Sequence, residues 1–193
     1  MSRWRSELLS QLCGEVLELG AGTGLNLEHY PADVRSLTLV EPDRAMRQQL
    51  RRRLSNSSIQ TRIRVDDSPA ERLHAGSDSV DAVVGTLVLC SVQSVEQTLQ
   101  EVRRVLRPGG TLVLIEHVAA PENTWRWRWQ KWLEPTWRFV SDGCCLLRDP
   151  RQLIGASGFE LMQVKECELQ GVPGFIKPAF IGTWKRSGAS PAR

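Results

Sequence analysis

Strand-like runs of apolar and β-branched residues alternate with amphipathic stretches along the chain. The strand-like runs are Val16–Leu19, Ser36–Val40, Arg62–Val65, Asp81–Leu89, Thr111–Glu116, Glu160–Glu168 and Ala179–Lys185. Stretches with helical spacing lie between several of them, and they are Asp43–Leu54, Val95–Leu106 and, approximately, Pro150–Ala156. This alternation predicts an α/β fold in which helices cover both faces of a mostly parallel sheet.

The second helical stretch has a well-marked end. Apolar residues recur at helical spacing from Val95 to Leu106, and the residues R-P-G-G follow from Arg107 to Gly110. Proline and glycine at these positions predict that the helix stops and that the chain turns before the next strand. No repeat or linker divides the sequence, and we therefore expect one domain over residues 1–193.

Composition and charge narrow the class of protein. Apolar residues make up 41% of the 193 residues and charged residues 24%, and the net charge of +3 is too small to indicate a nucleic-acid partner. The five cysteines form no C-x-x-C pair, which favours a reduced setting over a disulfide framework. The N-terminus has no apolar signal, and the most apolar window, Val80–Val92, is too short to span a bilayer. We expect a cytoplasmic protein whose membrane contact, if it has any, is peripheral.

The strongest local signal is a glycine loop, E-V-L-E-L-G-A-G-T-G, which ends at Gly24. An apolar strand leads directly into Gly20, Gly22 and Gly24. Glycine suits a tight turn and a close approach between the backbone and a ligand, and the free N–H groups of a following helix bind anionic groups. A dinucleotide fingerprint needs a further glycine at the position that Leu25 occupies here.

A carboxylate is expected beside this loop. The run S-L-T-L-V-E-P ends a predicted strand with Glu41, about 20 residues beyond the loop. A carboxylate at this place accepts hydrogen bonds from both ribose hydroxyls of an adenosine ligand, and the geometry serves NAD and S-adenosylmethionine equally. Glu41 therefore indicates an adenosine ligand, and Leu25 disfavours an NAD-dependent oxidoreductase. We expect Glu41 to be an exposed acid at the edge of the sheet that supports no core.

The loop resembles motif I of the class I S-adenosylmethionine-dependent methyltransferases, because an acid, Glu18, stands two residues ahead of a G-x-G-x-G spacing. The run S-P-A-E-R-L resembles the segment that wraps the adenine in that family, with Pro69 where an aspartate is common. The resemblance implies S-adenosylmethionine as cofactor and S-adenosylhomocysteine as product. The residues expected to bind the cofactor are Glu18, Gly20, Ala21, Gly22, Gly24, Asn26, Glu41, Pro42, Ala70, Glu71, Thr86 and Leu87.

The second half of the chain resembles one group more closely. The runs T-L-V-L-C-S-V, L-R-P-G-G, E-H-V-A-A, L-E-P-x-W and D-G-C-x-L-x-R look like the thiol S-methyltransferase group called methyltransferase-like 7, over about residues 15–185. The resemblance implies a Rossmann-like sheet of seven strands in the order 3-2-1-4-5-7-6 with the last strand antiparallel. It also implies a small lipophilic thiol as methyl acceptor. Animal members of this group have an N-terminal hydrophobic anchor, and class I enzymes usually have a helix ahead of the glycine loop. Because this sequence has only about 14 residues ahead of the strand that leads into the loop, we expect neither feature.

A tryptophan-rich segment, T-W-R-W-R-W-Q-K-W-L-E-P-T-W, follows the fifth predicted strand as part of a lid insertion at about 119–148. On a helix, Trp125, Trp129 and Trp132 share one face, whereas Trp137 diverges from it. Pro135 is expected to end that helix. The shared face is interpreted as a wall of the acceptor pocket, with core packing and contact with a membrane interface as alternatives. No basic stripe continues elsewhere, and we expect no nucleic-acid partner.

Methyl transfer from a sulfonium is an in-line displacement, and a thiol acceptor reacts as the thiolate. His117, at the end of the fifth predicted strand, is the expected base, and Asp142 is a second catalytic candidate. Arg148 is expected in the acceptor pocket. A one-step displacement needs no nucleophile from the enzyme, and so we expect Cys144 and its neighbour to be small buried apolar residues. We expect no metal ligands.

Two other functions remain open from the residues alone. The acceptor can be a quinone, a phenol or a lipid headgroup in place of a thiol. The chain can also be a non-catalytic module of the same fold that binds a membrane interface. In each case the partner is a small molecule or a lipid surface.

Overall fold

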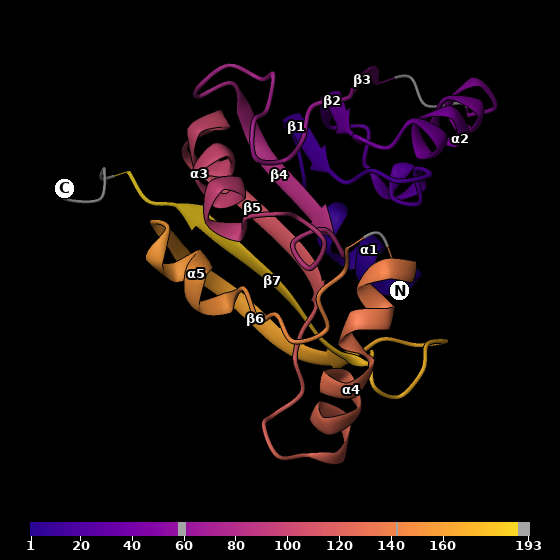
Figure 1. The fold of residues 1–193 in the computed structure, drawn as a ribbon. Coiled ribbons are helices and arrows are strands. Elements are labelled where there is room, and N and C mark those ends of the chain that lie inside the picture. The colour runs from indigo at the N-terminus through magenta and orange to yellow at the C-terminus, as the bar shows by residue number, and fades with distance from the viewer. Residues whose placement is uncertain (58–60, 142, 189–193) are drawn as a thin grey trace.

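Seven strands form one sheet in the order β3-β2-β1-β4-β5-β7-β6 (Figure 1). The computed structural model describes residues 1–57, 61–141 and 143–188. The strands are β1 (Gly14–Leu19), β2 (Val34–Val40), β3 (Arg62–Asp66), β4 (Val80–Thr86), β5 (Leu106–His117), β6 (Phe159–Glu168) and β7 (Pro178–Arg186). The helices are α1 (Ser2–Leu9), η1 (Leu27–His29), α2 (Arg44–Ser55), α3 (Val95–Val105), α4 (Trp125–Val140) and α5 (Arg151–Ala156).

The direction of the strands confirms the predicted topology. Strands β1 to β5 are mutually parallel, whereas β7 runs antiparallel to both β5 and β6. Parallel strands end at the same edge of a sheet, and so the loops after β1, β2, β4 and β5 meet at one edge. The reversed strand β7 lets the segment between β6 and β7 reach this edge as well.

Helices cover both faces of the sheet, as predicted. One apolar cluster packs α3 and α5, through residues such as Leu99 and Ile154, against side chains of β1, β4 and β5. A second cluster on the opposite face packs α1, η1 and α2, through Leu9, Leu27 and Leu50. Alternate residues of each central strand serve the two clusters, as the pleat of a strand requires.

Two strands have different bounds from those predicted. β4 ends at Thr86, three residues before the expected Leu89, because the buried Glu116 carboxylate accepts the N–H groups of Val88 (2.9 Å) and Leu89 (3.0 Å) and turns the chain. β5 begins at Leu106, but its register against β4 shifts directly afterwards: Leu106 pairs with Val80 and Thr111 pairs with Ala82, so R-P-G-G has no partner residue in β4. Gly109 has a φ angle of +77°, and the predicted turn is therefore present as a bulge at the start of the strand. The predicted helix end is correct, since α3 stops at Val105.

A helix precedes the glycine loop, contrary to the expectation that none would form. α1 has two turns, and its Leu9 is 1% exposed in the core. Trp4 of the same helix packs against a third apolar cluster at the edge of the sheet where the loops meet. Burial of one face stabilises a helix that is too short to be stable alone, and length was therefore a poor guide.

Helix α4 continues past Pro135, which was wrongly expected to end it. A proline inside a helix lacks an N–H and clashes with the carbonyl four residues before it. Leu133 and Trp137, on either side, both pack against the third apolar cluster, and this contact holds the helix together. The whole segment is fastened where it leaves the sheet, because the Ala119 N–H donates to the Arg148 carbonyl (3.0 Å).

Candidate active site

The glycine loop brings bare backbone to the edge of the sheet. Gly20 and Gly22 have φ angles of +57° and +55°, which residues with a side chain rarely adopt. A Cβ atom on Gly20 would lie 2.8 Å from Cγ2 of Val88, in the turn after β4. A Cβ atom on Gly22 would meet no atom closer than 3.9 Å, so the backbone at Gly22 is open to a ligand.

Glu41 contacts this loop directly. The N–H of Gly22 donates to its Oε2 (2.8 Å), and the N–H of Asp43 donates to its Oε1 (2.9 Å). The residue is 7% exposed, so it is not the exposed edge acid that we expected. Each carboxylate oxygen has a further lone pair, and both can accept a hydroxyl proton from a ligand.

Glu18 and Asn26 form a buried polar group behind the loop. The Asn26 amide donates to Glu18 Oε1 (2.9 Å) and to the Thr86 hydroxyl (3.1 Å), and the Tyr30 hydroxyl donates to Glu18 Oε2 (2.8 Å). Burial raises the pKa of Glu18 to about 7, and the bonds from Tyr30 and Asn26 oppose the shift. The Asn26 Oδ1 is buried and has no partner among the described residues, and it can therefore accept from a ligand.

The other residues predicted for the cofactor lie around the same edge in different roles. The Ala21 N–H donates to the Val40 carbonyl (3.0 Å), and Leu87, which follows β4, has a φ angle of +55°. Ala70 is buried in the core, while Pro42 is exposed. Oε1 of Glu71 accepts the N–H of Gln93 (2.7 Å), so this carboxylate holds the loop before α3.

His117 ends β5 and is almost fully buried, with 2% of its surface exposed. Neither of its ring nitrogens has a hydrogen-bond partner among the described residues. Burial lowers the pKa of His117 to about 4, while the nearby Glu134 carboxylate acts in the opposite direction. The imidazole is therefore neutral at neutral pH and has two free nitrogens.

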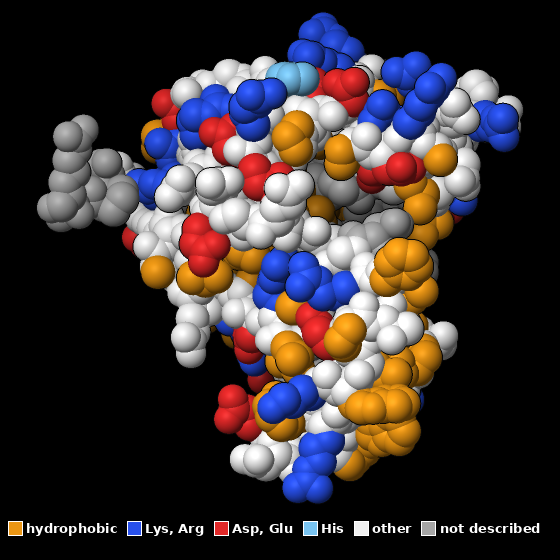
Figure 2. Space-filling view, viewed as in Figure 1, with side chains coloured by type: hydrophobic (Ala, Val, Ile, Leu, Met, Phe, Trp, Pro, Cys, Tyr) orange, Lys and Arg blue, Asp and Glu red, His pale blue; other side chains and the backbone are white. Residues whose placement is uncertain are grey.

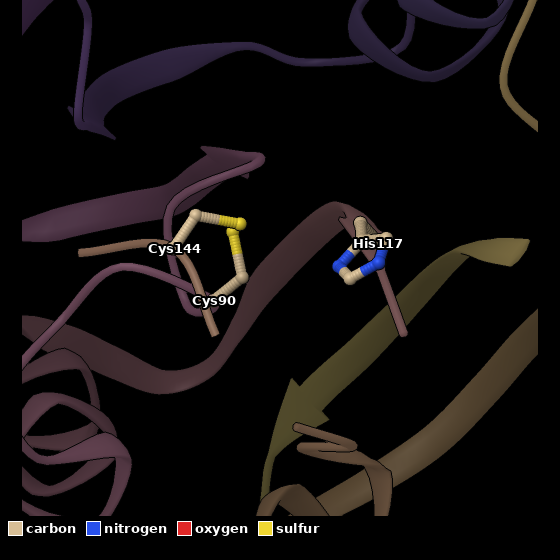
Figure 3. A group of neighbouring side chains, drawn as sticks. All are labelled: Cys90, His117 and Cys144. Carbon is tan, nitrogen blue, oxygen red and sulfur yellow. The ribbon is translucent and has the colours of Figure 1, made fainter. Parts of the chain in front are cut away.

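Two cysteines lie beside this histidine. Cys90 is in the turn after β4, and Cys144 is in the segment between α4 and α5 (Figure 3). The hydrogen bond between the two thiols lowers the pKa of Cys144 to about 7 and raises the pKa of Cys90 well above its usual value. Cys144 and Cys145 are both only half-buried, and so the expectation of buried apolar residues was wrong for both.

The tryptophans of α4 separate as predicted, but the shared face is open to solvent. Trp125 is 60% exposed, Trp129 50% and Trp132 72%, and the last two form an edge-to-face pair. Apolar side chains gather on the surface over α4 (Figure 2). Among the described residues, no helix is long and apolar enough to cross a bilayer.

Trp137 points the other way and packs against Phe175 at a right angle, with ring centroids 5.7 Å apart. Together with Trp4 and Leu87, these rings pack on the third apolar cluster. Sequence reasoning missed Trp4 and Phe175 as site residues, because neither lies near a motif. The signals for Trp137 were the run of alternating tryptophans and the L-E-P-x-W run that it ends.

The remaining two predicted residues have separate outcomes. Arg148 donates from Nη1 to the carbonyl oxygens of Leu89 (2.7 Å) and Val92 (2.8 Å), and it thus fixes the turn that contains Cys90. Asp142 lies outside the described residues, so its catalytic role stays a prediction.

Comparisons with known proteins identify the class of enzyme. A family model described as a methyltransferase domain matches residues 17–114. Human thiol S-methyltransferase TMT1B is 40% identical over 191 residues, which are 94% of this chain and 76% of that protein. Geranyl diphosphate methyltransferase in complex with S-adenosylmethionine has a TM-score of 0.74 at 15% identity, over 96% of this chain and 84% of that one. The [4+2]-cyclase SpnF has a TM-score of 0.75 at 17% identity, over 96% and 79%.

A sheet of this topology, with a glycine loop and a carboxylate at the end of the next strand, defines an α/β enzyme that binds an adenosine ligand at the switch point of its sheet. The chain belongs to the methyltransferase domain family, and it is an S-adenosylmethionine-dependent methyltransferase. This confirms the resemblance on which the cofactor was predicted.

The residues present fit S-adenosylmethionine. The ligand has ribose hydroxyls that donate, which suits the two oxygens of Glu41, and a cationic amino group, which suits the unpaired Oδ1 of Asn26. The open backbone at Gly22 leaves room for the ligand where a side chain would fill the space.

Proposed function

We propose that this enzyme methylates the sulfur of a small lipophilic thiol. The observation that carries the proposal is the 40% identity to human thiol S-methyltransferase TMT1B over 94% of the chain. That similarity extends beyond residue 114, where the matched domain model ends, and so it includes the segment around α4. Insertions at this place form acceptor pockets in enzymes of this fold, and they are where related enzymes differ.

The apolar cluster at the edge of the sheet supports a lipophilic acceptor. Trp4, Leu87, Trp137 and Phe175 come from four separate segments and pack together beside the loop after β4. Apolar and aromatic walls with few polar groups are typical of sites for small lipophilic ligands. The neighbouring polar groups are His117 and the two cysteines, so few polar side chains adjoin these apolar walls.

We assign the methyl donor and the methyl acceptor to different residues. S-adenosylmethionine, when bound, supplies a methyl group on a positively charged sulfur. Glu41 and Asn26 hold the donor, and the aromatic cluster excludes water from the acceptor. His117 is the group that we place against the acceptor thiol as a neutral imidazole; its lowered pKa makes it a poor proton acceptor, so it assists ionisation of the thiol indirectly.

A panel of acceptors tests the proposal. Purified enzyme and isotope-labelled donor are incubated with a small alkyl thiol, the matching alcohol and the matching amine, a quinol and phosphatidylethanolamine vesicles. We expect label in the thioether alone. Label in the alcohol, the amine, the quinol or the lipid, without any thioether, would show that the acceptor belongs to that class and is not a thiol.

A thermal-shift measurement with S-adenosylhomocysteine separates a failed acceptor from a failed enzyme. A ligand that binds the folded state raises the melting temperature by mass action. A shift without methylated product means that the correct acceptor is missing from the panel. No shift with the product and none with the donor would contradict a functional cofactor site.

We infer also that the exposed face of α4 rests on the surface of an anionic lipid bilayer. Five large apolar side chains are exposed there, namely Trp125, Trp129, Trp132, Phe139 and Val140. Exposed cationic side chains flank them, namely Arg128, Lys131 and Arg138. Tryptophan and cationic residues together on one helix are the composition of an in-plane interfacial helix.

Vesicle sedimentation tests this inference. Changing Trp125, Trp129 and Trp132 together to Ala should abolish binding to vesicles that contain phosphatidylserine. The matched control changes three exposed apolar residues of β6, Leu161, Met162 and Val164, to Ala and should leave binding unchanged. Equal loss in both variants would show that binding follows general hydrophobicity and not the α4 face.

A further inference from the structure

Three ligand-type side chains from distant parts of the chain meet at the edge of the sheet. Cys90 lies in the turn after β4, His117 is the last residue of β5, and Cys144 follows α4. The two sulfur atoms and a ring nitrogen of His117 all lie within 4.8 Å of one another (Figure 3). Soft sulfur with imidazole nitrogen is a ligand set that zinc prefers.

The buried ring nitrogens of His117 lack a hydrogen-bond partner within the described ranges. The residue is 2% exposed. A buried polar group without a partner destabilises a protein, and such groups are rare in native structures. A metal ion bound to one nitrogen would satisfy it, and the adjacent sulfur atoms would complete the ligands.

Hydrogen bonds fix the backbone that carries the two cysteines. The N–H of Cys145 donates to the Cys90 carbonyl (2.8 Å), so the two cysteine segments are joined directly. Arg148 bonds to the carbonyl oxygens on both sides of Cys90, at Leu89 and Val92. Supports of this kind orient ligands in metal sites and make them specific.

We propose that Cys90, His117 and Cys144 bind one zinc ion, and that the fourth position of the ion takes the acceptor sulfur as thiolate. The second part rests on the proposed thiol acceptor. Ligands of a tetrahedral zinc ion lie about 3.5 to 3.8 Å apart, so the limit of 4.8 Å requires only small side-chain shifts. Three protein ligands and one open position are the arrangement of catalytic zinc sites.

The site adjoins the cofactor loop. Val88, two residues before Cys90, packs so closely on Gly20 that a Cβ atom there would lie 2.8 Å from it. A thiolate on the ion therefore lies on the same edge of the sheet as the open backbone of Gly22. His117 acts in this scheme as a ligand and not as a proton acceptor.

The bonds and charges balance. The acceptor S–H bond breaks as the sulfur binds zinc, and the proton leaves to solvent. The thiolate sulfur then forms a bond to the methyl carbon, the bond from that carbon to the sulfonium breaks, and its electron pair stays on the sulfur of S-adenosylhomocysteine. The thioether product is a weaker ligand than a thiolate, so it leaves the ion.

Metal binding is tested without any activity measurement. The purified protein is stripped with a chelator, and zinc or cobalt(II) is added in increments under reducing conditions. We expect one equivalent of zinc and, with cobalt, a sulfur-to-metal charge-transfer band with the visible bands of a tetrahedral ion. Cys144→Ser and His117→Asn should each weaken zinc binding at least about 100-fold.

Cys145→Ser is the matched control, because Cys145 neighbours Cys144 in sequence but lies outside the cluster. It should bind zinc like the wild type. Loss of fold in Cys90→Ser would not affect the test, because the half-buried Cys144 provides an independent variant. Absence of stoichiometric zinc in the wild type, or a Cys90–Cys144 disulfide as the stable form under reducing conditions, would overturn the proposal.

The visible spectrum of the cobalt protein tests the fourth position of the metal ion separately. Adding the alkyl thiol to the cobalt protein should change the visible bands, whereas the matching alcohol should not. Unchanged bands with intact metal binding would contradict the thiolate position while leaving the metal site in place. If the thiol changes the bands but no thioether forms with donor present, the proposed methylation fails and the metal site stands.

Discussion

Two groups of polar side chains lie at one edge of this sheet, and they differ in how their hydrogen bonds are satisfied. Around the glycine loop, Glu41 accepts two backbone N–H groups and Glu18 accepts from two side chains. Around the end of β5, both nitrogens of His117 have no partner among the described residues. In the first group the protein satisfies the hydrogen bonds of the side chains, except at the atoms that meet the methyl donor. In the second group the described part of the protein leaves the hydrogen-bonding atoms of His117 without partners.

The two groups also differ in the distance along the chain that they join. Apart from the Thr86 hydroxyl of β4, the loop group comes from residues 18–43, that is, from β1, the neighbouring β2 and the loops that follow them. The β5 group joins residues 90, 117 and 144 through α4. We infer that the donor site is formed by local structure, and that the acceptor site depends on the docking of α4. Four changes test this difference, and they follow in order of decreasing expected effect.

The largest effect is expected at Glu41. Glu41→Ala removes a carboxylate that accepts from the ribose, and it should weaken S-adenosylhomocysteine binding about 100-fold or more by calorimetry, because each hydrogen bond to a charged group contributes about 1.5–3 kcal/mol. Glu28→Ala, which changes an exposed acid near the loop, is the control and should bind normally. Normal affinity in Glu41→Ala would contradict the assignment of the donor site.

Docking of α4 is tested at Gln130, which is fully buried. Its amide accepts the Ala120 N–H (2.7 Å) and donates to the carbonyl oxygens of Val118 (3.3 Å) and Phe175 (2.9 Å). Gln130→Leu leaves these backbone groups unpaired and should cost about 3 kcal/mol of stability in urea unfolding. Donor affinity at low temperature should be preserved, and methyl transfer should fall. Parallel loss of both would show that the two groups are not separate.

The pH dependence of stability is tested at Glu18. Its folded pKa is about 7 and its ordinary value is 4.5, so the unfolded chain loses this proton first as the pH rises. The contribution of Glu18 is therefore present below about pH 4.5 and is lost as the pH rises to about 7, on the order of 3 kcal/mol. Burial also raises the pKa of Glu116 to about 7, so Glu18→Gln should remove only its own share of the decline in urea unfolding, whereas Glu28→Gln should leave the decline unchanged. A decline of equal size in Glu18→Gln would assign it to other groups.

The smallest effect on stability is expected at Gly22. Gly22→Ala meets open space, and the positive φ angle alone should cost about 1 kcal/mol. Donor affinity should nevertheless fall, because the new methyl group occupies the surface that the ligand approaches. In Gly24→Ala the Cβ atom would lie 2.7 Å from Leu27 and Leu50, so that variant should lose more stability. Thermal melts with and without S-adenosylhomocysteine measure both effects.

The sequence predicted that the glycine loop and Glu41 lie together at the edge of the sheet, and the structure shows this contact. A glycine loop and an acid one strand later are set by short-range spacing, and the parallel sheet order places them together. Glu41 was nevertheless expected to be exposed, because its bond to the Gly22 N–H depends on the loop conformation. The seven-stranded topology was predicted through the family resemblance and not from the pattern of strands.

The acceptor half was less predictable because it depends on packing between distant segments. α1 and the continuation of α4 past Pro135 both rely on contacts with the same apolar cluster, which no local pattern contains. The meeting of Cys90, His117 and Cys144 likewise has no spacing signature. His117 was singled out only because it ends a strand at the edge where the donor binds.

The hydrogen bond between the Ala119 N–H and the Arg148 carbonyl has a consequence for how such enzymes diversify. The chain leaves β5 near Ala119 and returns toward α5 near Arg148, and this bond joins the two places. The segment between them therefore has fixed ends. A segment of another length or shape can replace it between these two residues without displacing the strands that lead to Gly22 and Glu41. A change in this one segment can then change the acceptor, while the site for the methyl donor stays the same.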